Sequence, residues 1–250
     1  LDVRDGRPFS NDVVGHYVFN VHWAPDSSEV RLHRTDRLQQ ILELSGCSPG
    51  TGVCRRIVRE EWPTGWVENR PTYRLFDDGR RFVWASDRTG WRNYYLYEVT
   101  GRLVNPITTL AGVDAGPVVK IDEAAGVLFY MAGDGDTPLK MQLHRVGLDG
   151  TGDRRITDPA FTHRVTISPD NHYYVDVAQD HMRPPTTSLV SMDGGTIATL
   201  ATSDITRFDE LKLRPIETFT YLAADGATTL VGANLATVRI AVRRSSSPPE

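Results

Sequence analysis

Short runs dominated by apolar, aromatic and β-branched residues recur along the chain, and turn-forming residues separate them. Four examples are RFVWAS, NYYLYEV, GVLFYMA and HYYVDVA. Runs of this length and composition predict β-strands. Helical periodicity is nearly absent before Asp204. The pattern therefore predicts an all-β fold.

The strand runs belong to a repeat. Most of four segments show an acidic turn, a strand, a polar loop, a second strand and a turn with glycine, and the segments are Trp23–Leu44, Leu75–Gly101, Lys120–Gly150 and Ile167–Gly195. If Asp26, Asp78, Glu123 and Asp170 are equivalent turn positions, the repeats are 52, 45 and 47 residues apart. This spacing predicts one four-stranded antiparallel blade per repeat, and hence a partial β-propeller of about four blades.

The repeat suggests how the chain is divided. We expect propeller blades in residues 1–203, with repeats near 16–62, 66–109, 113–158 and 161–203. Ser203 or Asp204 could cap a short connector helix in 204–214. Two strand-like runs around an Asp225-Gly226 turn follow in 215–235, and 236–250 is a polar tail expected to be flexible.

Composition excludes two classes of partner. The formal net charge is -4, with both signs mixed along the chain, so a basic surface for nucleic acid is not expected. No run approaches the roughly 18 apolar residues of a membrane span, and the start LDVRDG is no signal peptide. Because the chain opens on Leu1, we expect it to be a piece of a longer protein.

Cysteines and acidic loops give no metal site. Cys47 and Cys54 are separated by SPGTGV, which could join two hairpin arms, so a disulfide and two free thiols both stay open. Neither cysteine has the partner set of a zinc site. Asp134 and Asp136 in GDGDTP suggest calcium, but the loop lacks the further oxygen donors and the closing glutamate of an EF-hand.

No catalytic residue is expected in this chain. The pattern G-x-S-x-G occurs once, at residues 46–50, where a nucleophile elbow would require a strand-to-helix turn. The surrounding sequence instead predicts strand, turn and strand, and Pro49 lacks the N–H that an oxyanion hole needs after Ser48. The histidines lie mostly in predicted strands, which favours core or blade-face positions.

Three stretches together resemble one family. They read GWVENRPTYRLFDDGRRFVWASDRTGWRNYYLYEVTGRL, QLHRVGLDGTGDRRITD and ISPDNHYYVDVAQDHMRPPTTSLV. Between about Trp23 and Leu230 the chain resembles the N-terminal propeller of dipeptidyl peptidase IV-like serine peptidases of the prolyl oligopeptidase family. ETFTYLAADGATTLVG is similar to the strand by which that family enters its α/β-hydrolase domain.

The resemblance implies that this chain is the C-terminal half of an eight-bladed propeller, followed by a short helix and the first strands of a missing hydrolase domain. The Ser, Asp and His of that serine-type exopeptidase would lie beyond Glu250, so the chain alone is expected to be inactive. The resemblance implies no cofactor, and it is compatible with an extracytoplasmic or periplasmic location.

In the family, a double glutamate on the propeller binds the free N-terminal ammonium of the substrate. That motif lies shortly before a W-S-P-D-G-like turn, which here is residues 23–26, and no Glu-Glu precedes it. Glu60 and Glu61 instead precede TGWVENRP. Their position therefore disfavours amine binding and favours an exposed acidic turn between blades.

The loop 66–71 matches a family loop that faces the internal cavity. The resemblance makes Trp66, Glu68 and Arg70 candidate substrate-binding residues, with Arg70 donating to a peptide carbonyl or carboxylate and Glu68 ordering it. Packing at the start of a blade is the alternative. Asp87 and Arg88 are expected to brace a β-turn.

The leading hypothesis is the propeller portion of a serine-type dipeptidyl peptidase, which gates and orients peptides for a hydrolase domain outside this chain. Its partners would be peptide substrates, and a homodimer is compatible with the resemblance. A non-enzymatic protein-interaction scaffold and a truncated gene remnant stay open as alternatives. A G-x-S-x-G motif after a strand beyond Glu250 would favour the peptidase.

Overall fold

The computed structural model describes residues 17–210, 217–222, 224 and 228–233. Sixteen strands form four sheets in chain order, here called blades 1 to 4. Blade 1 contains β1 (Tyr17–Trp23), β2 (Val30–Thr35), β3 (Ile41–Cys47) and β4 (Cys54–Glu61). Blade 2 contains β5 (Tyr73–Leu75), β6 (Arg81–Ser86), β7 (Asn93–Glu98) and β8 (Leu103–Pro106). Blade 3 contains β9 (Ala115–Asp122), β10 (Val127–Ala132), β11 (Gln142–Gly147) and β12 (Arg154–Arg155). Blade 4 contains β13 (Thr162–Ile167), β14 (Tyr173–Gln179), β15 (Thr186–Ser191) and β16 (Thr196–Thr202).

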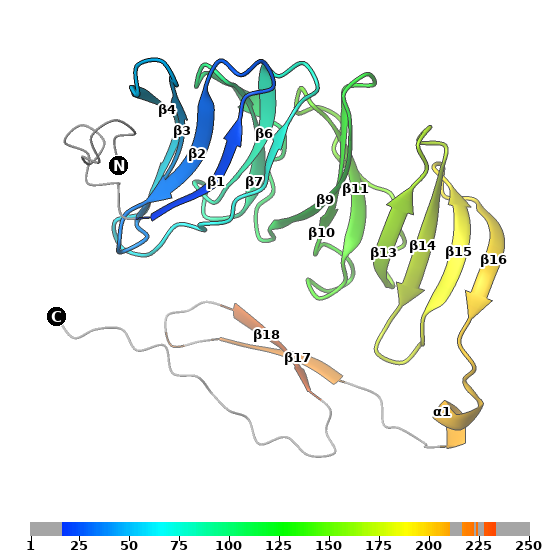
Figure 1. Cartoon of the computed structure of the whole chain (residues 1–250). Coiled ribbons are helices and arrows are strands. Elements are labelled where there is room, and N and C mark those ends of the chain that lie inside the picture. Colours follow the sequence, from blue (N-terminus) through cyan, green and yellow to red (C-terminus); the bar gives the residue numbers. More distant parts are fainter. Residues whose placement is uncertain (1–16, 211–216, 223, 225–227, 234–250) are drawn as a thin grey trace.

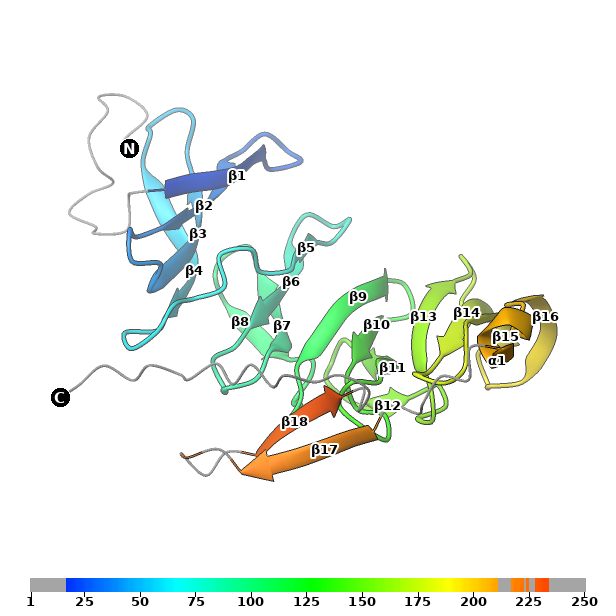
Figure 2. The same ribbon diagram turned by 90° about the horizontal axis from the view of Figure 1, so that it is seen from below.

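The blades follow one another side by side (Figure 1). Seen from below, they form a curved row, and the first strand of each blade lies on its concave side (Figure 2). Within each blade, every strand pairs antiparallel with the next one in sequence. The predicted fold class, an all-β partial propeller of four four-stranded blades, is confirmed.

The acidic positions that defined the repeat lie in equivalent turns. Asp26, Asp78, Glu123 and Asp170 each fall between the first and second strands of a blade. One residue with positive φ occurs in each of these turns, and these residues are Ser27, Gly79, Gly126 and Asn171. Tight turns often need this left-handed conformation, which glycine and asparagine adopt at low cost. The repeat in the sequence is thus a repeat of hairpin turns.

The apolar runs of the second strands pack against two neighbours at once. Because successive side chains alternate between faces, β6 places Phe82 and Trp84 against blade 1 and Val83 and Ala85 against blade 3. Phe82, Val83 and Trp84 are fully buried. Burying an apolar side chain of this size contributes about 1.5–3 kcal/mol. A strand buried on both faces has no polar alternation, which explains the run RFVWAS.

The same arrangement recurs in blade 3. On β10, Leu128 and Tyr130 join the apolar layer shared with blade 2, whereas Phe129 and Met131 pack with residues of blade 4. Hydrogen bonds between neighbouring turns add to these layers, since Glu123 of blade 3 accepts the backbone N–H of Asp77 at 2.9 Å. The blades are therefore joined by continuous apolar layers.

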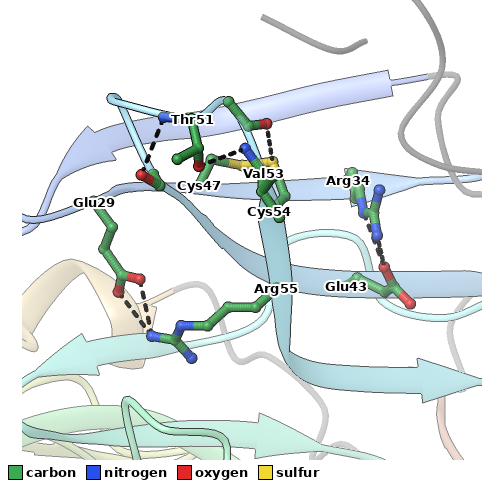
Figure 3. Close-up of a disulfide and its surroundings, with 10 residues drawn as sticks. Glu29, Arg34, Glu43, Cys47, Thr51, Val53, Cys54 and Arg55 are labelled. Carbon is green, nitrogen blue, oxygen red and sulfur yellow. Dashed lines mark hydrogen bonds and ion pairs between the residues drawn. A yellow bond between two sulfur atoms is a disulfide. The ribbon is translucent and has the colours of Figure 1, made fainter.

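Cys47 and Cys54 lie opposite each other on β3 and β4 and form a disulfide, with Cα atoms 3.9 Å apart (Figure 3). The segment SPGTGV is the hairpin loop between them, and it is closed by a 2.9 Å hydrogen bond from Ser48 N to Val53 O. Ser48 therefore lies in a hairpin loop between two strands. The disulfide, one of the two alternatives left open by the sequence, is the one observed.

Replacing both cysteines with serine should lower the free energy of unfolding by about 2–3 kcal/mol, because the short loop loses its covalent closure in the unfolded chain. Urea denaturation with and without a reductant measures the loss. Reduced wild-type protein is the control and should match the double variant. Equal midpoints for oxidised wild type and the double variant would show that the bond does not stabilise this hairpin.

Beyond blade 4, the helix α1 spans Thr206–Glu210, and β17 (Glu217–Leu222) pairs with β18 (Thr228–Ala233). The helix falls within the predicted connector 204–214, and the two strands fall within 215–235. The predicted tail 236–250 lies outside the described residues. The division into domains stays a prediction. In the part of the chain that the structure describes, no helix is long and apolar enough to cross a membrane.

Candidate functional site

Four of the five candidate residues line one pocket at the junction of blades 1 and 2. Glu60 and Glu61 end β4, and Trp66 and Glu68 lie in the loop 62–72 that leads from β4 to β5. The pocket has a volume of about 240 Å³. Arg70 lies outside it, in a neighbouring groove. The double glutamate and most of the loop 66–71, which are separate candidate sites in the sequence, thus line the same pocket.

Glu60 connects blade 1 to blade 2. One carboxylate oxygen, Oε1, accepts from Trp84 Nε1 at 3.0 Å and from an Arg88 guanidinium nitrogen at 2.6 Å. The other, Oε2, accepts from Ser86 Oγ at 2.9 Å. The side chain of Glu60 is only 12% exposed. The prediction of an exposed acidic turn is therefore wrong for Glu60. The Arg88 guanidinium neutralises its charge, and its carboxylate accepts three hydrogen bonds.

Glu61 has a different environment. Adjacent residues of a strand point to opposite faces, and Glu61 pairs with Arg59 Nε at 3.1 Å on the same strand. Its side chain is 49% exposed. The two neighbouring carboxylates thus have separate partners, one between blades and one near solvent, and only Glu61 retains free acceptor capacity.

Arg88 forms part of the floor of the pocket. Its guanidinium lies over the ring of Tyr95, with the carbon 4.3 Å from the ring centroid, and its Nε donates to Ser86 Oγ at 2.9 Å. A guanidinium over an aromatic face is a favourable cation–π contact. The sequence predicted a turn brace at Asp87 and Arg88, but the bond of Arg88 to Glu60 extends that role across two blades.

Arg92 lies among three carboxylates at the rim. Its Nε is 3.4 Å from Asp87 Oδ1, a guanidinium nitrogen is 3.8 Å from Glu68 Oε2, and its backbone N–H donates to Asp114 Oδ1 at 2.7 Å. Burial raises the pKa of Asp87, and although Arg92 opposes this, Asp114 and Glu68 raise the pKa further. The rim thus carries more negative charge than its guanidinium neutralises.

Two tryptophans border the same pocket. Trp62 is 40% exposed and Trp66 is 78% exposed. A Cβ at Gly65 would lie 2.9 Å from Trp62 Cδ1, so a larger residue there would displace the indole. An indole exposed to this degree contributes little to packing. Trp66 is therefore available for a contact outside the apolar layers of the blades.

Arg70 is exposed and borders a groove with Tyr17, Phe19 and Asn69. Its backbone N–H donates to Glu68 Oε1 at 2.9 Å, which fixes the turn of the loop. Within the described residues, the Arg70 guanidinium forms no hydrogen bond or ion pair. Glu68 therefore orders the backbone of Arg70, while the guanidinium is oriented by no protein group that the structure describes.

Buried histidines elsewhere pair with aspartates. His163 Nδ1 lies 2.9 Å from Asp176 Oδ2, and His144 Nδ1 lies 3.1 Å from Asp153 Oδ1. Asp134, considered above as a calcium ligand, lies 3.0 Å from His144 Nε2. Among the described residues, no group of three or more potential metal ligands occurs. These pairs lie away from the pocket between blades 1 and 2.

Sequence reasoning missed the role of Arg92 and Asp114 in this site. Arg92 is far from the loop 66–71 in sequence yet lines the same pocket, and Asp114 lies beside it and accepts the Arg92 backbone N–H. Arg92 lies in the motif TGWRN, which in the sequence supports only the family resemblance. A pattern of strands does not show which turns of neighbouring blades meet, so no signal in this single sequence could have found them.

Known proteins share both the sequence pattern and the fold. The model of the dipeptidyl peptidase IV (DPP IV) N-terminal region matches residues 3–185. The structure of Porphyromonas gingivalis dipeptidyl peptidase 4 is similar, with a TM-score of 0.69 and 18% identity, covering 84% of this chain and 30% of that one. A putative dipeptidyl aminopeptidase IV from Bacteroides ovatus ATCC 8483 has a TM-score of 0.69 and 22% identity, covering 86% of this chain and 33% of that one.

These two similarities show a shared fold, and the present chain spans about a third of the length of each protein. The family match is independent of them and extends over most of the four blades, including the pocket between blades 1 and 2. This chain therefore belongs to the dipeptidyl peptidase IV N-terminal region family.

Proposed function

We propose that this chain is the propeller portion of a serine-type dipeptidyl peptidase, and that it orients peptides for a hydrolase domain outside the chain. Membership in the DPP IV N-terminal region family supports the proposal, as do the two similar proteins described as dipeptidyl peptidases. Holding one end of a peptide sets which bond reaches a catalytic centre, so a binding surface can govern cleavage without performing it.

The proposal rests on one observation, which is that the loop 66–71 presents exposed side chains. Trp66 and Arg70 are exposed, and within the described residues the Arg70 guanidinium has no carboxylate partner. A guanidinium presents a planar fork of donors that suits a peptide carbonyl or carboxylate. The backbone bond from Arg70 to Glu68 holds the loop in one conformation and reduces the entropy lost on binding.

Replacing Arg70 with alanine should weaken the binding of a tetrapeptide with free termini about tenfold, since a charge-assisted hydrogen bond contributes about 1.5–3 kcal/mol. Isothermal titration calorimetry on the full chain measures the change. Arg80→Ala is the matched control, because Arg80 is also exposed but lies in the turn between β5 and β6. Equal affinities for wild type and Arg70→Ala, or an equal loss in Arg80→Ala, would contradict the proposal.

A further inference from the structure

The rim of the pocket between blades 1 and 2 has an unbalanced charge. Glu68 and Asp87 lie beside the single guanidinium of Arg92, and Asp114 accepts the backbone N–H of the same residue. The separations of 3.8 Å to Glu68 and 3.4 Å to Asp87 are longer than those of strong charge-assisted hydrogen bonds. Burial raises the pKa of Asp87, and the neighbouring carboxylates of Asp114 and Glu68 raise it further. A bound cation would relieve this excess.

The carboxylate of Glu60, inside the pocket, already has hydrogen-bond donors from the protein. Glu60 uses both carboxylate oxygens to accept hydrogen bonds from Trp84, Ser86 and Arg88. A ligand cation would have to displace Arg88 to reach it, and that guanidinium is held over Tyr95. The carboxylates with acceptor capacity left are those at the mouth, on Glu61, Glu68 and Asp87.

Aromatic faces accompany these carboxylates. Trp62 and Trp66 line the same pocket, and both side chains are exposed. The face of an indole ring attracts cations more strongly than that of any other aromatic side chain. Pockets that place aromatic faces beside carboxylates discriminate against anions and favour organic cations.

We propose that this pocket binds a guanidinium group, supplied by an arginine side chain of a bound peptide. A guanidinium is planar, so it can lie on an indole face and donate from its edge to carboxylates at the mouth. A compact, strongly hydrated ammonium gains less from the indole face and cannot form a forked pair with a carboxylate. The inference deepens the proposed function, because Trp66 and Glu68 belong to the same loop as Arg70.

The test uses N-acetyl-arginine amide, which has no free amine, as the probe of the full chain, with binding followed by NMR of the indole N–H groups. The neutral isostere N-acetyl-citrulline amide and the ammonium analogue N-acetyl-lysine amide are the ligand controls. A dipeptide amide with a free N-terminal amine and no basic side chain distinguishes a terminal amine from a side chain. We expect the arginine probe to bind at least tenfold more tightly than each of the other three.

Variants locate the site. Trp66→Ala and Glu68→Gln should each weaken the arginine probe at least fivefold. The controls are Trp23→Ala, an exposed tryptophan on β1 outside the pocket, and Glu210→Gln, an exposed carboxylate on α1, and both should leave the affinity unchanged. Equal binding of arginine and citrulline probes, or full affinity in both pocket variants, would overturn the proposal, and equal binding of the lysine or free-amine probe would overturn its guanidinium specificity.

The Arg70→Ala variant separates this inference from the proposed function. Arg70 lies outside the pocket, so the variant should bind the arginine probe with wild-type affinity while losing affinity for the tetrapeptide with free termini. Loss of arginine binding in Arg70→Ala would contradict the assigned pocket. Unchanged tetrapeptide binding together with intact, Trp66-dependent arginine binding would refute the proposed role of Arg70 and support the guanidinium site.

Discussion

Replacing Glu60 with alanine should lower the free energy of unfolding by about 3 kcal/mol, because the change leaves a partly buried guanidinium without its carboxylate. Three donors would lose their acceptor at once, namely Trp84 Nε1, Ser86 Oγ and Arg88. Trp84 is fully buried and Ser86 is 4% exposed, so water cannot readily replace the lost bonds. Chemical denaturation followed by far-UV circular dichroism measures the loss.

The neighbouring glutamate supplies the control. Glu61 is 49% exposed and pairs with Arg59, so Glu61→Ala should cost at most about 0.5 kcal/mol, as expected for a surface ion pair. The two variants remove the same atoms from adjacent positions of one strand. Similar losses in both would contradict the assignment of Glu60 as the residue that joins blades 1 and 2.

The contrast between these glutamates shows where sequence reasoning reaches its limit. Strand alternation predicts that Glu60 and Glu61 point to opposite faces, but not which face meets another blade. That choice depends on the register of β4, where Glu60 lies beside Leu42 and Glu61 beside Ile41. The partners of Glu60 lie 24 to 28 residues further along the chain. The local pattern therefore predicts the strand β4, but not the burial of the Glu60 carboxylate.

The blades themselves could be predicted because their cause is local. Each repeat has its own hairpin turn, and the apolar runs between turns are long enough for one strand each. Asp26, Asp78, Glu123 and Asp170 were recognised because every blade needs the same turn at the same place. The ion pairs of Arg92 with Glu68 and Asp87 depend instead on contact between the loop 62–72 and the turn between β6 and β7, which no local repeat of strands and turns specifies.

The disulfide is intermediate between these cases. The short, turn-rich spacer between Cys47 and Cys54 allowed a hairpin with the cysteines opposite each other, but an offset of one residue would have placed them on different faces. The observed register pairs Cys47 directly with Cys54. Sequence alone could therefore state both alternatives and not decide between them.

His33 illustrates a buried group whose environment no sequence pattern showed. Its ring is stacked between Phe19 and Trp84, with centroids 5.6 and 5.7 Å away, and the residue is 1% exposed. Neither ring nitrogen has a hydrogen-bond partner among the described residues. Burial, with a smaller contribution from His22, lowers the pKa of His33 to about 4. The imidazole is therefore neutral in the folded protein at neutral pH.

Acidification should destabilise the protein through His33. The unfolded chain has a histidine pKa of about 6.5, so below that pH it binds a proton that the folded protein excludes until about pH 4. Stability rises with pH wherever the unfolded state binds more protons. This group alone should lower the free energy of unfolding by about 3 kcal/mol between pH 7 and pH 4, and urea denaturation across that range measures the slope.

His33→Phe isolates this contribution from the carboxylates that also titrate at low pH. Phenylalanine keeps an aromatic ring between Phe19 and Trp84 and removes both nitrogens, so the variant should be as stable as wild type at pH 7.5, or about 1 kcal/mol more stable. Its stability should fall less steeply on acidification, with the difference from wild type growing as pH decreases from about 6.5 to 4. Parallel pH profiles for the two proteins would mean that His33 is protonated or solvated in the folded state, contrary to its position in the aromatic layer between blades 1 and 2.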